Sequence, residues 1–304
     1  MADKNPLSSE SLFEHVQDGT YFHVPRDIAP EGSHGHINIP QWFQGDKPLW
    51  DGKTGVESID KLNILGPLDF EFTKFMILEL VVAALIAVFF IGLSARIRYG
   101  GPPKGRFWNL LEVMYEFIRD QVARPAIGKE DGDKFLPFLL TLFFFILGCN
   151  LTGMIPWLGS PTGALATTSA LAVIAFLVVV GSGVKKLGPA GFLKAQVPHM
   201  DLPGPLAIIL KPMIFAIELM GLFIKHFVLA IRLLANMMAG HIVLAVIVGF
   251  IAVTGGTWLF AGVMPVSIVG AVALSMLELF VAFLQAYVFV FLTALFIGAA
   301  VHPH

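Results

Sequence analysis

Five long apolar segments dominate this 304-residue sequence and restrict the folds that it can adopt. They cover approximately residues 72–93, 135–157, 164–184, 212–253 and 263–301. A helix that crosses the hydrocarbon core of a bilayer needs about 20 apolar residues, and each segment is long enough. The sequence therefore predicts an all-α polytopic membrane protein with about five membrane-crossing helices.

The composition agrees with this fold class. Hydrophobic residues make up 56% of the chain and charged residues only 14%, whereas soluble globular proteins carry about 25% charged residues. The formal net charge is −2, so bulk charge does not favour a nucleic-acid partner.

The last two apolar segments are longer than one perpendicular crossing requires. Forty helical residues extend over roughly 60 Å, about twice the hydrocarbon thickness. Such helices must tilt strongly or run partly in the membrane plane. Gly255 and Gly256 lie between the two segments and supply a turn. We therefore expect the chain to end in a hairpin of two long, tilted helices.

Residues 107–126 show a different pattern. Apolar residues recur there at helical spacing, but charged residues interrupt them at Glu112, Glu116, Arg119, Asp120 and Arg124. This pattern favours an amphipathic helix that lies along the membrane surface. We expect Pro125 to end it.

Residues 1–70 are polar and contain no segment long enough to cross a bilayer. A helix is plausible over residues 8–17. His23, His34 and His36 could bind a metal ion, although a solvated loop is the simpler interpretation, and we expect no metal site. We treat residues 1–70 as a separate extracytoplasmic region and residues 71–304 as the transmembrane domain.

The distribution of basic residues predicts the orientation. The first apolar segment is followed by Arg96, Arg98, Lys104 and Arg106, and the third by Lys185 and Lys186. Basic residues next to membrane spans stay in the cytoplasm. Five crossings then place the N-terminus outside the cytoplasm and the C-terminus inside it. This pattern and the polar N-terminus favour the plasma (inner) membrane of a bacterium.

Ionisable residues interrupt the two long segments, although such residues are costly in a membrane and usually mark ion or substrate pathways. At 100° per residue, Glu218, Lys225, Arg232 and Asn236 form one polar stripe. His241 lies about 180° from Arg232 on the same helix. In the second long segment, Glu278 and Gln285 are seven residues apart and share a face.

These residues could instead act as internal packing contacts. Glu218 could pair with Lys225, and Arg232 could pair with Glu278. Arginine is a poor choice for packing alone, because its guanidinium group does not lose its proton in proteins. His241 and Glu278 can both exchange protons.

The segment from Arg232 to His241, RLLANMMAGH, resembles the signature of subunit a of the rotary (F-type) ATP synthases. The resemblance covers about residues 70–300 and includes the turn NLTGMIP at residues 150–156, with Gln285 downstream. It implies a non-catalytic, proton-translocating subunit without a cofactor, in which two aqueous half-channels lead to a ring of c subunits. Arg232 would face the ring carboxylates. Asn236, His241, Glu278 and Gln285 would line or support the proton path, and Glu218 would lie along a half-channel.

The resemblance also implies partners, namely the c-ring, the peripheral-stalk b subunits, other ATP synthase subunits and membrane lipid. Residues 71–304 would be the proton-channel domain. Two departures matter. Some bacterial members have an acid at the position of His241 and a histidine at that of Glu278, so the exchange suggests that these two residues approach each other across the hairpin. Some members have Asp at the position of Gly153.

Two other classes of protein fit parts of the pattern. A secondary transporter could use the polar hairpin as a substrate site, although such transporters often show internal repeats and none is evident here. A membrane scaffold would use the polar stripe only to hold its helices together.

Overall fold

The computed structural model describes residues 18–23, 36–41, 72–98, 105–155, 158–195 and 204–302. Two short strands, β1 (Tyr21–His23) and β2 (His36–Asn38), pair antiparallel. The rest is helical and consists of α3 (Lys74–Arg98), α4 (Arg106–Phe117), the π-helical η1 (Ile118–Ala123), α5 (Arg124–Ile127), α6 (Lys129–Gly153), the 3-10 turn η2 (Pro161–Gly163), α7 (Leu165–Leu187), α8 (Pro189–Ala195), α9 (Gly204–Thr254) and α10 (Phe260–Val301).

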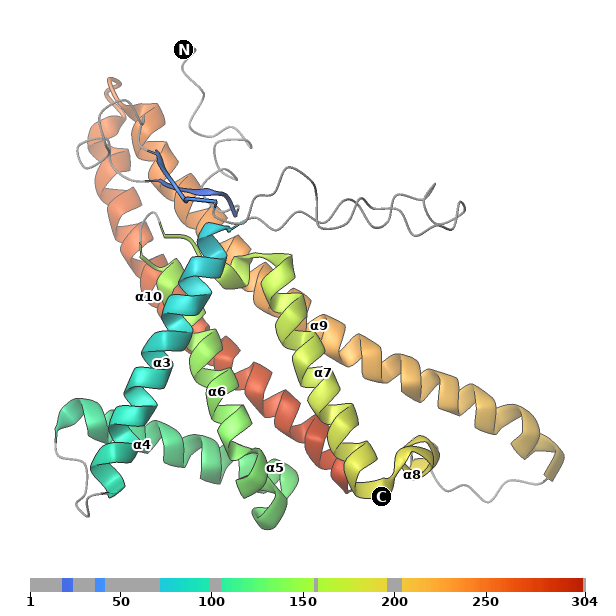
Figure 1. Cartoon of the computed structure of the whole chain (residues 1–304). Coiled ribbons are helices and arrows are strands. Elements are labelled where there is room, and N and C mark those ends of the chain that lie inside the picture. Colours follow the sequence, from blue (N-terminus) through green and yellow to red (C-terminus); the bar gives the residue numbers. More distant parts are fainter. Residues whose placement is uncertain are drawn as a thin grey trace.

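Within the described part of the chain, α3, α6, α7, α9 and α10 are long and apolar enough to cross a membrane. The expected all-α polytopic fold with about five crossings is therefore confirmed. In Figure 1, the sheet and the α9–α10 turn lie at one end of the bundle, and α4, α5, α8 and the C-terminus lie at the other. The five helices thus run alternately between two ends.

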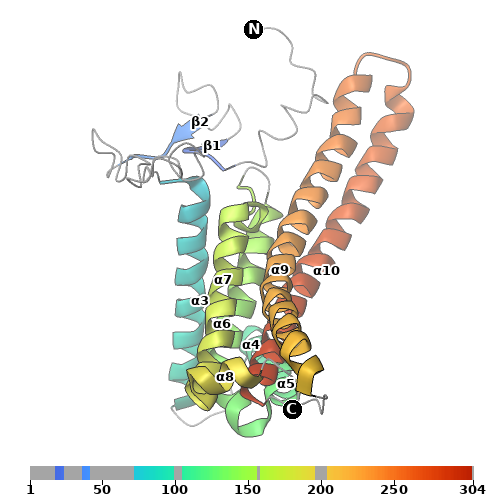
Figure 2. The same ribbon diagram turned by 90° about the vertical axis from the view of Figure 1, so that its right-hand side faces the viewer.

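The C-terminal hairpin has the expected form. Helix α9 contains 51 residues and α10 contains 42, and the chain reverses through Gly256, whose φ of +85° suits glycine. Figures 1 and 2 show both helices inclined to the upright group α3, α6 and α7. Helix α9 begins earlier than predicted, so that Pro212 lies inside it.

Helix α10 is the centre of the packing, because it contacts α6, α7 and α9, while α9 also packs on α7 and α3 packs on α6. Phe143 and Ile146 of α6 are fully buried with Phe289 and Ile297 of α10. Lipid tails are as apolar as these side chains, so close packing, and not the hydrophobic effect, favours helix association in a membrane.

The predicted surface helix is present as a continuous run through α4, η1 and α5. Its side chains Phe107, Leu110 and Val113 are exposed, and it crosses the end of the bundle at a steep angle to α3 and α6 (Figure 1). The expectation that Pro125 ends it is wrong. Pro125 lies in the first turn of α5, directly after the π-helical segment, and a proline is tolerated in a first helical turn because its missing N–H is not needed there. The helix then ends at Gly128.

Charged residues link the surface helix to α6. Arg124 donates to Asp133 at 2.9 Å and to Asp120 at 3.0 Å, and Arg119 also donates to Asp120. The hydrogen bonds from Arg119, followed by the two nearby guanidinium charges, hold the pKa of Asp120 below its usual value. These contacts fix η1 and α5 against the start of α6.

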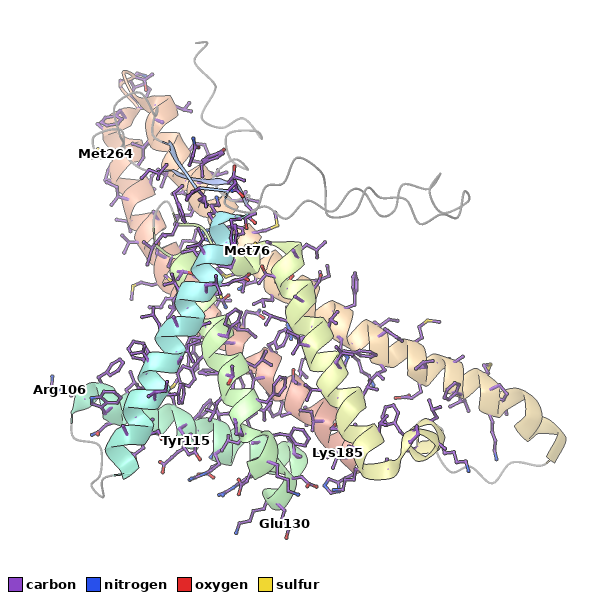
Figure 3. All side chains as sticks on the ribbon, viewed as in Figure 1. Met76, Arg106, Tyr115, Glu130, Lys185 and Met264 are labelled. Carbon is purple, nitrogen blue, oxygen red and sulfur yellow. The ribbon has the colours of Figure 1, made fainter. Side chains whose placement is uncertain are left out.

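A second cluster joins three helix ends around Asp131 of α6. Lys134 donates to this carboxylate at 2.9 Å, Lys186 at the end of α7 also pairs with it, and His302 just after α10 lies 3.3 Å from it. Figure 3 shows this end of the bundle marked by Arg106, Glu130 and Lys185.

The short sheet is an element that the sequence pattern did not predict. It is fastened to α3, because Asp18 accepts a hydrogen bond from the backbone N–H of Phe75 at 3.2 Å. Gln41 both donates to and accepts from the backbone of Phe72 at 2.8 Å. The helix expected at residues 8–17 and the possible histidine metal site lie outside the described residues and side chains.

Gly298 of α10 permits the closest approach between α10 and α5. A Cβ atom at this position would overlap the backbone carbonyl oxygen of Ala126. Backbone cannot move aside as a flexible side chain can, so a larger residue here must separate the two helices.

We therefore expect Gly298→Ala to destabilise the protein by about 1–3 kcal/mol through overpacking. The amount of subunit in the membrane and the unfolding midpoint of the solubilised complex measure the effect. Gly262→Ala, also in α10, is the matched control because nothing lies within 4 Å of its added Cβ. Equal behaviour of the two variants would contradict this packing analysis.

Candidate functional site

Arg232 lies near the middle of α9 and is half-buried. Its Nε and Nη2 atoms are buried and have no hydrogen-bond partner among the described residues. Within the same part of the chain Arg232 forms no ion pair, so the alternative pairing with Glu278 is not found. A buried, unpaired guanidinium is strongly unfavourable. The described residues therefore supply no anion for this guanidinium group.

The surroundings of Arg232 show which side is open. Leu229, Leu233 and Met237 are buried on the face of α9 that packs into the bundle, whereas Phe227 and Val228 are exposed. Arg232 lies at the margin between these faces. The guanidinium group can therefore reach a partner without displacing the core.

Glu218 and Lys225 form the ion pair that the sequence left open. The Lys225 Nζ atom lies 3.6 Å from Glu218 Oε1, and the two side chains are 48% and 46% exposed. This half of the polar stripe therefore neutralises its own charge, while Arg232 does not. The difference separates Arg232 from its neighbours on the stripe.

His241 and Glu278 approach each other across the hairpin, as their exchanged positions suggested. His241 Nδ1 lies 3.9 Å from Glu278 Oε1, and the side chains are only 15% and 12% exposed. Gly240 makes this approach possible, because a Cβ atom there would overlap the Glu278 carboxylate. The hairpin thus brings one imidazole and one carboxyl group together inside the protein.

Asn236 and Gln285 are both half-buried. Among the described residues, neither forms a hydrogen bond with Arg232. The expected support of Arg232 by Gln285 therefore stays a prediction. The stripe places Asn236 one turn from Arg232 on α9, between the arginine and His241 along the helix axis.

A buried polar network, which the sequence pattern did not predict, joins Asn150 near the end of α6 to the turn before α7. Thr162 donates to Asn150 Oδ1 at 2.6 Å and shares a 2.8 Å hydrogen bond with Ser160. Asn150 in turn donates to the backbone oxygen of Ala282 in α10 at 3.1 Å. All three polar side chains are almost completely buried. The sequence signal for this network was the occurrence of Asn150, Ser160 and Thr162 in a mainly apolar part of the chain.

Glu79 and His226 are further titratable side chains within the bundle. Glu79 of α3 accepts a hydrogen bond from Thr167 of α7 at 2.7 Å. His226 of α9 contacts the rings of Phe176 and Phe296, and its Nδ1 pairs with the backbone of its own helix. Each of these two side chains forms a hydrogen bond, whereas Arg232 Nε and Nη2 have no such partner among the described residues.

Comparison with known sequences decides the family. The sequence profile of the family described as "ATP synthase A chain" matches residues 76–298. The chain belongs to this family. The resemblance carried by Arg232–His241 is thus confirmed, and the matched region agrees with the expected extent. As a member of the ATP synthase A chain family with five potential membrane spans, the chain is a multi-pass membrane protein.

Several relatives in bacteria are named ATP synthase subunit a. The chain is 42% identical to the one from Myxococcus xanthus (strain DK1622) over 242 residues, which cover 79% of this chain and 77% of the relative. It is 39% identical to that of Chloroherpeton thalassium (strain ATCC 35110 / GB-78), covering 81% and 71%. For Rhodococcus erythropolis (strain PR4 / NBRC 100887) the identity is 37%, covering 77% and 84%.

The geometry of the site predicts a cross-linking result. In a Cys149→Ser background, His241→Cys combined with Glu278→Cys should react with a short thiol-specific bifunctional reagent, because the parent side chains meet across the hairpin. Mass spectrometry of the linked peptides measures the yield. Arg232→Cys combined with Glu278→Cys is the control and should give less product. A higher yield for the control pair would contradict the observed pairing.

Proposed function

We propose that this chain is the proton-translocating subunit a of a rotary ATP synthase, with Arg232 facing the carboxylates of the c-ring. The observation that supports this proposal most is the half-buried Arg232, which has no anionic partner among the described residues of a member of the ATP synthase A chain family. The missing partner is then an ion-binding carboxylate on a different, moving subunit.

Arg232 would act through its permanent charge. An ionised carboxylate on the ring is unfavourable in lipid but tolerable beside a fixed guanidinium group. Arg232 would therefore hold each ring carboxylate ionised as it passes, after the carboxylate has released its proton to one half-channel. The ring carboxylate then takes up a proton from the other half-channel. The fixed charge also repels protons that would otherwise pass directly between the half-channels.

His241 and Glu278 would belong to the outer half-channel together with Asn236. The hairpin places an imidazole beside a carboxyl group, and both types of group can take up and release protons. Glu218 would lie along a half-channel, where its ion pair with Lys225 compensates its charge. Gln285 would support the face of Arg232.

The membrane potential supplies the energy. It is worth roughly 2.3 kcal/mol for each charge that crosses 100 mV, so several protons per turn can drive rotation and ATP synthesis elsewhere in the complex. This chain would perform no bond chemistry itself. Its partners would be the c-ring, the peripheral-stalk b subunits, other subunits of the complex and membrane lipid.

The charge distribution supports one orientation. Arg106, Lys185 and Lys186 lie at the end of the bundle with α4 and α8, whereas residues 154–164 and 255–259, at the other end, contain no Lys or Arg. The first end would be cytoplasmic. The N-terminus would then be extracytoplasmic, the C-terminus cytoplasmic and the membrane the plasma membrane of a bacterium. Residues 1–70 would form the outer region and 71–304 the proton-channel domain.

Arg232→Ala should abolish ATP-driven proton pumping, because the variant lacks the fixed charge that ionises the ring carboxylate. Quenching of a pH-sensitive dye in inverted membrane vesicles measures pumping, and immunoblotting of the purified complex measures assembly. Lys211→Ala, which removes an exposed cation from the same helix, should keep most of the activity. Normal pumping by an assembled Arg232→Ala complex would exclude the proposed role.

The relay between the two long helices can be tested by exchange. The double variant His241→Glu with Glu278→His should pump faster than either single variant, because it restores one acid and one imidazole at the same contact. Each single variant leaves two groups of the same kind. A double variant that pumps no better than the more active single variant would count against a shared relay.

A further inference from the structure

Gly153, the last residue of α6, has no room for a side chain. A Cβ atom at this position would lie 2.5 Å from Ser160 Cβ, 2.9 Å from Ser160 Oγ and 3.1 Å from His241 Nε2. The first distance is a steric overlap. Gly153 therefore packs against both Ser160 and His241, and no carboxylate is accommodated at residue 153.

The same distances place Ser160 close to His241. Because one point lies 2.9 Å from Ser160 Oγ and 3.1 Å from His241 Nε2, the two atoms are at most about 6 Å apart. One water molecule that forms two hydrogen bonds of about 2.8–3.0 Å can connect groups at such a separation. Both groups are polar and buried, and polar partners are one of the conditions for binding an internal water.

The hydrogen-bond network determines which role the Ser160 hydroxyl takes. Thr162 donates its proton to Asn150 Oδ1 at 2.6 Å. The Ser160 proton is then directed to Thr162 Oγ1 at 2.8 Å or to the backbone oxygen of Cys149 at 3.2 Å. A hydroxyl group has one proton and two acceptor sites. Ser160 Oγ therefore remains available as an acceptor on its other side.

His241 faces Ser160 and Glu278 with different ring atoms. Its Nδ1 is the atom 3.9 Å from Glu278 Oε1, whereas its Nε2 is buried beside Gly153 and Ser160 and has no partner among the described residues. Within that part of the chain, Glu278 is the one ionisable group in ion-pair range of His241. The imidazole ring therefore separates the Ser160 side of the site from the carboxyl group.

Ser160 also lies toward the outer end of the bundle. It belongs to the turn between α6 and α7, which is at the end that carries the sheet (Figure 2). Ser160 is only 2% exposed, but Leu158, Gly159 and Gly163 around it are partly exposed. The turn therefore connects partly exposed residues with Ser160 beside the buried face of His241.

We propose that Ser160 positions a water molecule that delivers protons from the outer side to His241 Nε2. The inference rests on the proposed proton-channel function. The water donates one hydrogen bond to Ser160 Oγ, and a proton that reaches this water from outside passes to Nε2. The proton on Nδ1 then passes to the ionised Glu278 carboxylate when side-chain rotation shortens their 3.9 Å separation to a hydrogen bond. The imidazole has gained a proton on Nε2 and lost one from Nδ1, so it must return to its Nδ1–H tautomer before the next transfer. The water returns to neutrality, and Glu278 becomes neutral before it releases its proton to the ring side.

Ser160→Ala tests this role because it removes the acceptor without adding volume. We expect passive proton conductance, measured in membranes stripped of the catalytic sector, to fall about two- to tenfold, since one hydrogen bond to the transferring water is lost. Its half-maximal value should also shift to lower outer pH, because proton delivery becomes limiting. Ser182→Ala is the matched control. It removes a buried hydroxyl of α7 that bonds only within its own helix, and should change neither quantity.

A second pair keeps the test decisive if Ser160→Ala fails to assemble. Ser160→Thr and Ser160→Val have the same shape and differ in the hydroxyl group, so any packing defect is common to both. Conductance per assembled complex should be higher for the threonine variant. Equal conductance and an unchanged pH profile within this pair would overturn the role of Ser160.

Glu278→Gln, measured in the same membranes, separates this inference from the function on which it rests. If Glu278→Gln blocks conductance while Ser160→Ala matches Ser182→Ala, the water-positioning role is wrong and the proton-channel function stands. Normal conductance in Glu278→Gln would exclude the relay itself, and with it the role of Ser160.

Discussion

The unpaired charge of Arg232 is the physical constraint on which the rest of this structure depends. A guanidinium group cannot become neutral, and two of its nitrogen atoms are buried without a hydrogen-bond partner among the described residues. Nearby charges do not compensate it, because Lys225 pairs with Glu218 and His241 lies against Glu278. The chain therefore holds a cation ready for an anion that it does not itself supply in its described part.

Glycine residues make the neighbouring contacts of His241 possible. Gly240 admits the Glu278 carboxylate beside His241, and Gly153 admits His241 beside Ser160. Each is a position at which a methyl group would overlap a neighbouring polar residue. Small residues are common at helix contacts in membranes because they allow backbones to approach. Here they allow polar side chains to meet within an apolar bundle.

Much of the architecture could be predicted because membrane thickness restricts it. The length of each apolar segment indicated the crossings, and the excess length of α9 and α10 indicated a tilted hairpin. The exchanged identities of His241 and Glu278 indicated their contact. The π-helical turn beside Pro125 could not be predicted, because it depends on how the surface helix meets α6. The sheet was missed because its strands contain only three residues each.

The parts of the candidate site that could not be predicted from the sequence also depend on packing between elements. Helical periodicity places residues on one face of one helix, so the stripe from Glu218 to Asn236 could be predicted. Periodicity contains no information about which residues of a turn reach another helix. The position of Ser160 near His241, and of Thr162 beside Ser160, could therefore not be predicted from the sequence. Periodicity also left the pairing of Lys225 open. It places Glu218 and Lys225 on one face of α9, but it does not determine whether the two side chains form an ion pair.

The most direct test of the central claim is a density map of the intact complex at a resolution that shows side chains. We expect a carboxylate from a ring of small subunits to lie within about 4 Å of the Arg232 guanidinium group, the distance of an ion pair. Lipid against Arg232, or a carboxylate of this same chain as its partner, would contradict the claim that the assembled motor completes this site.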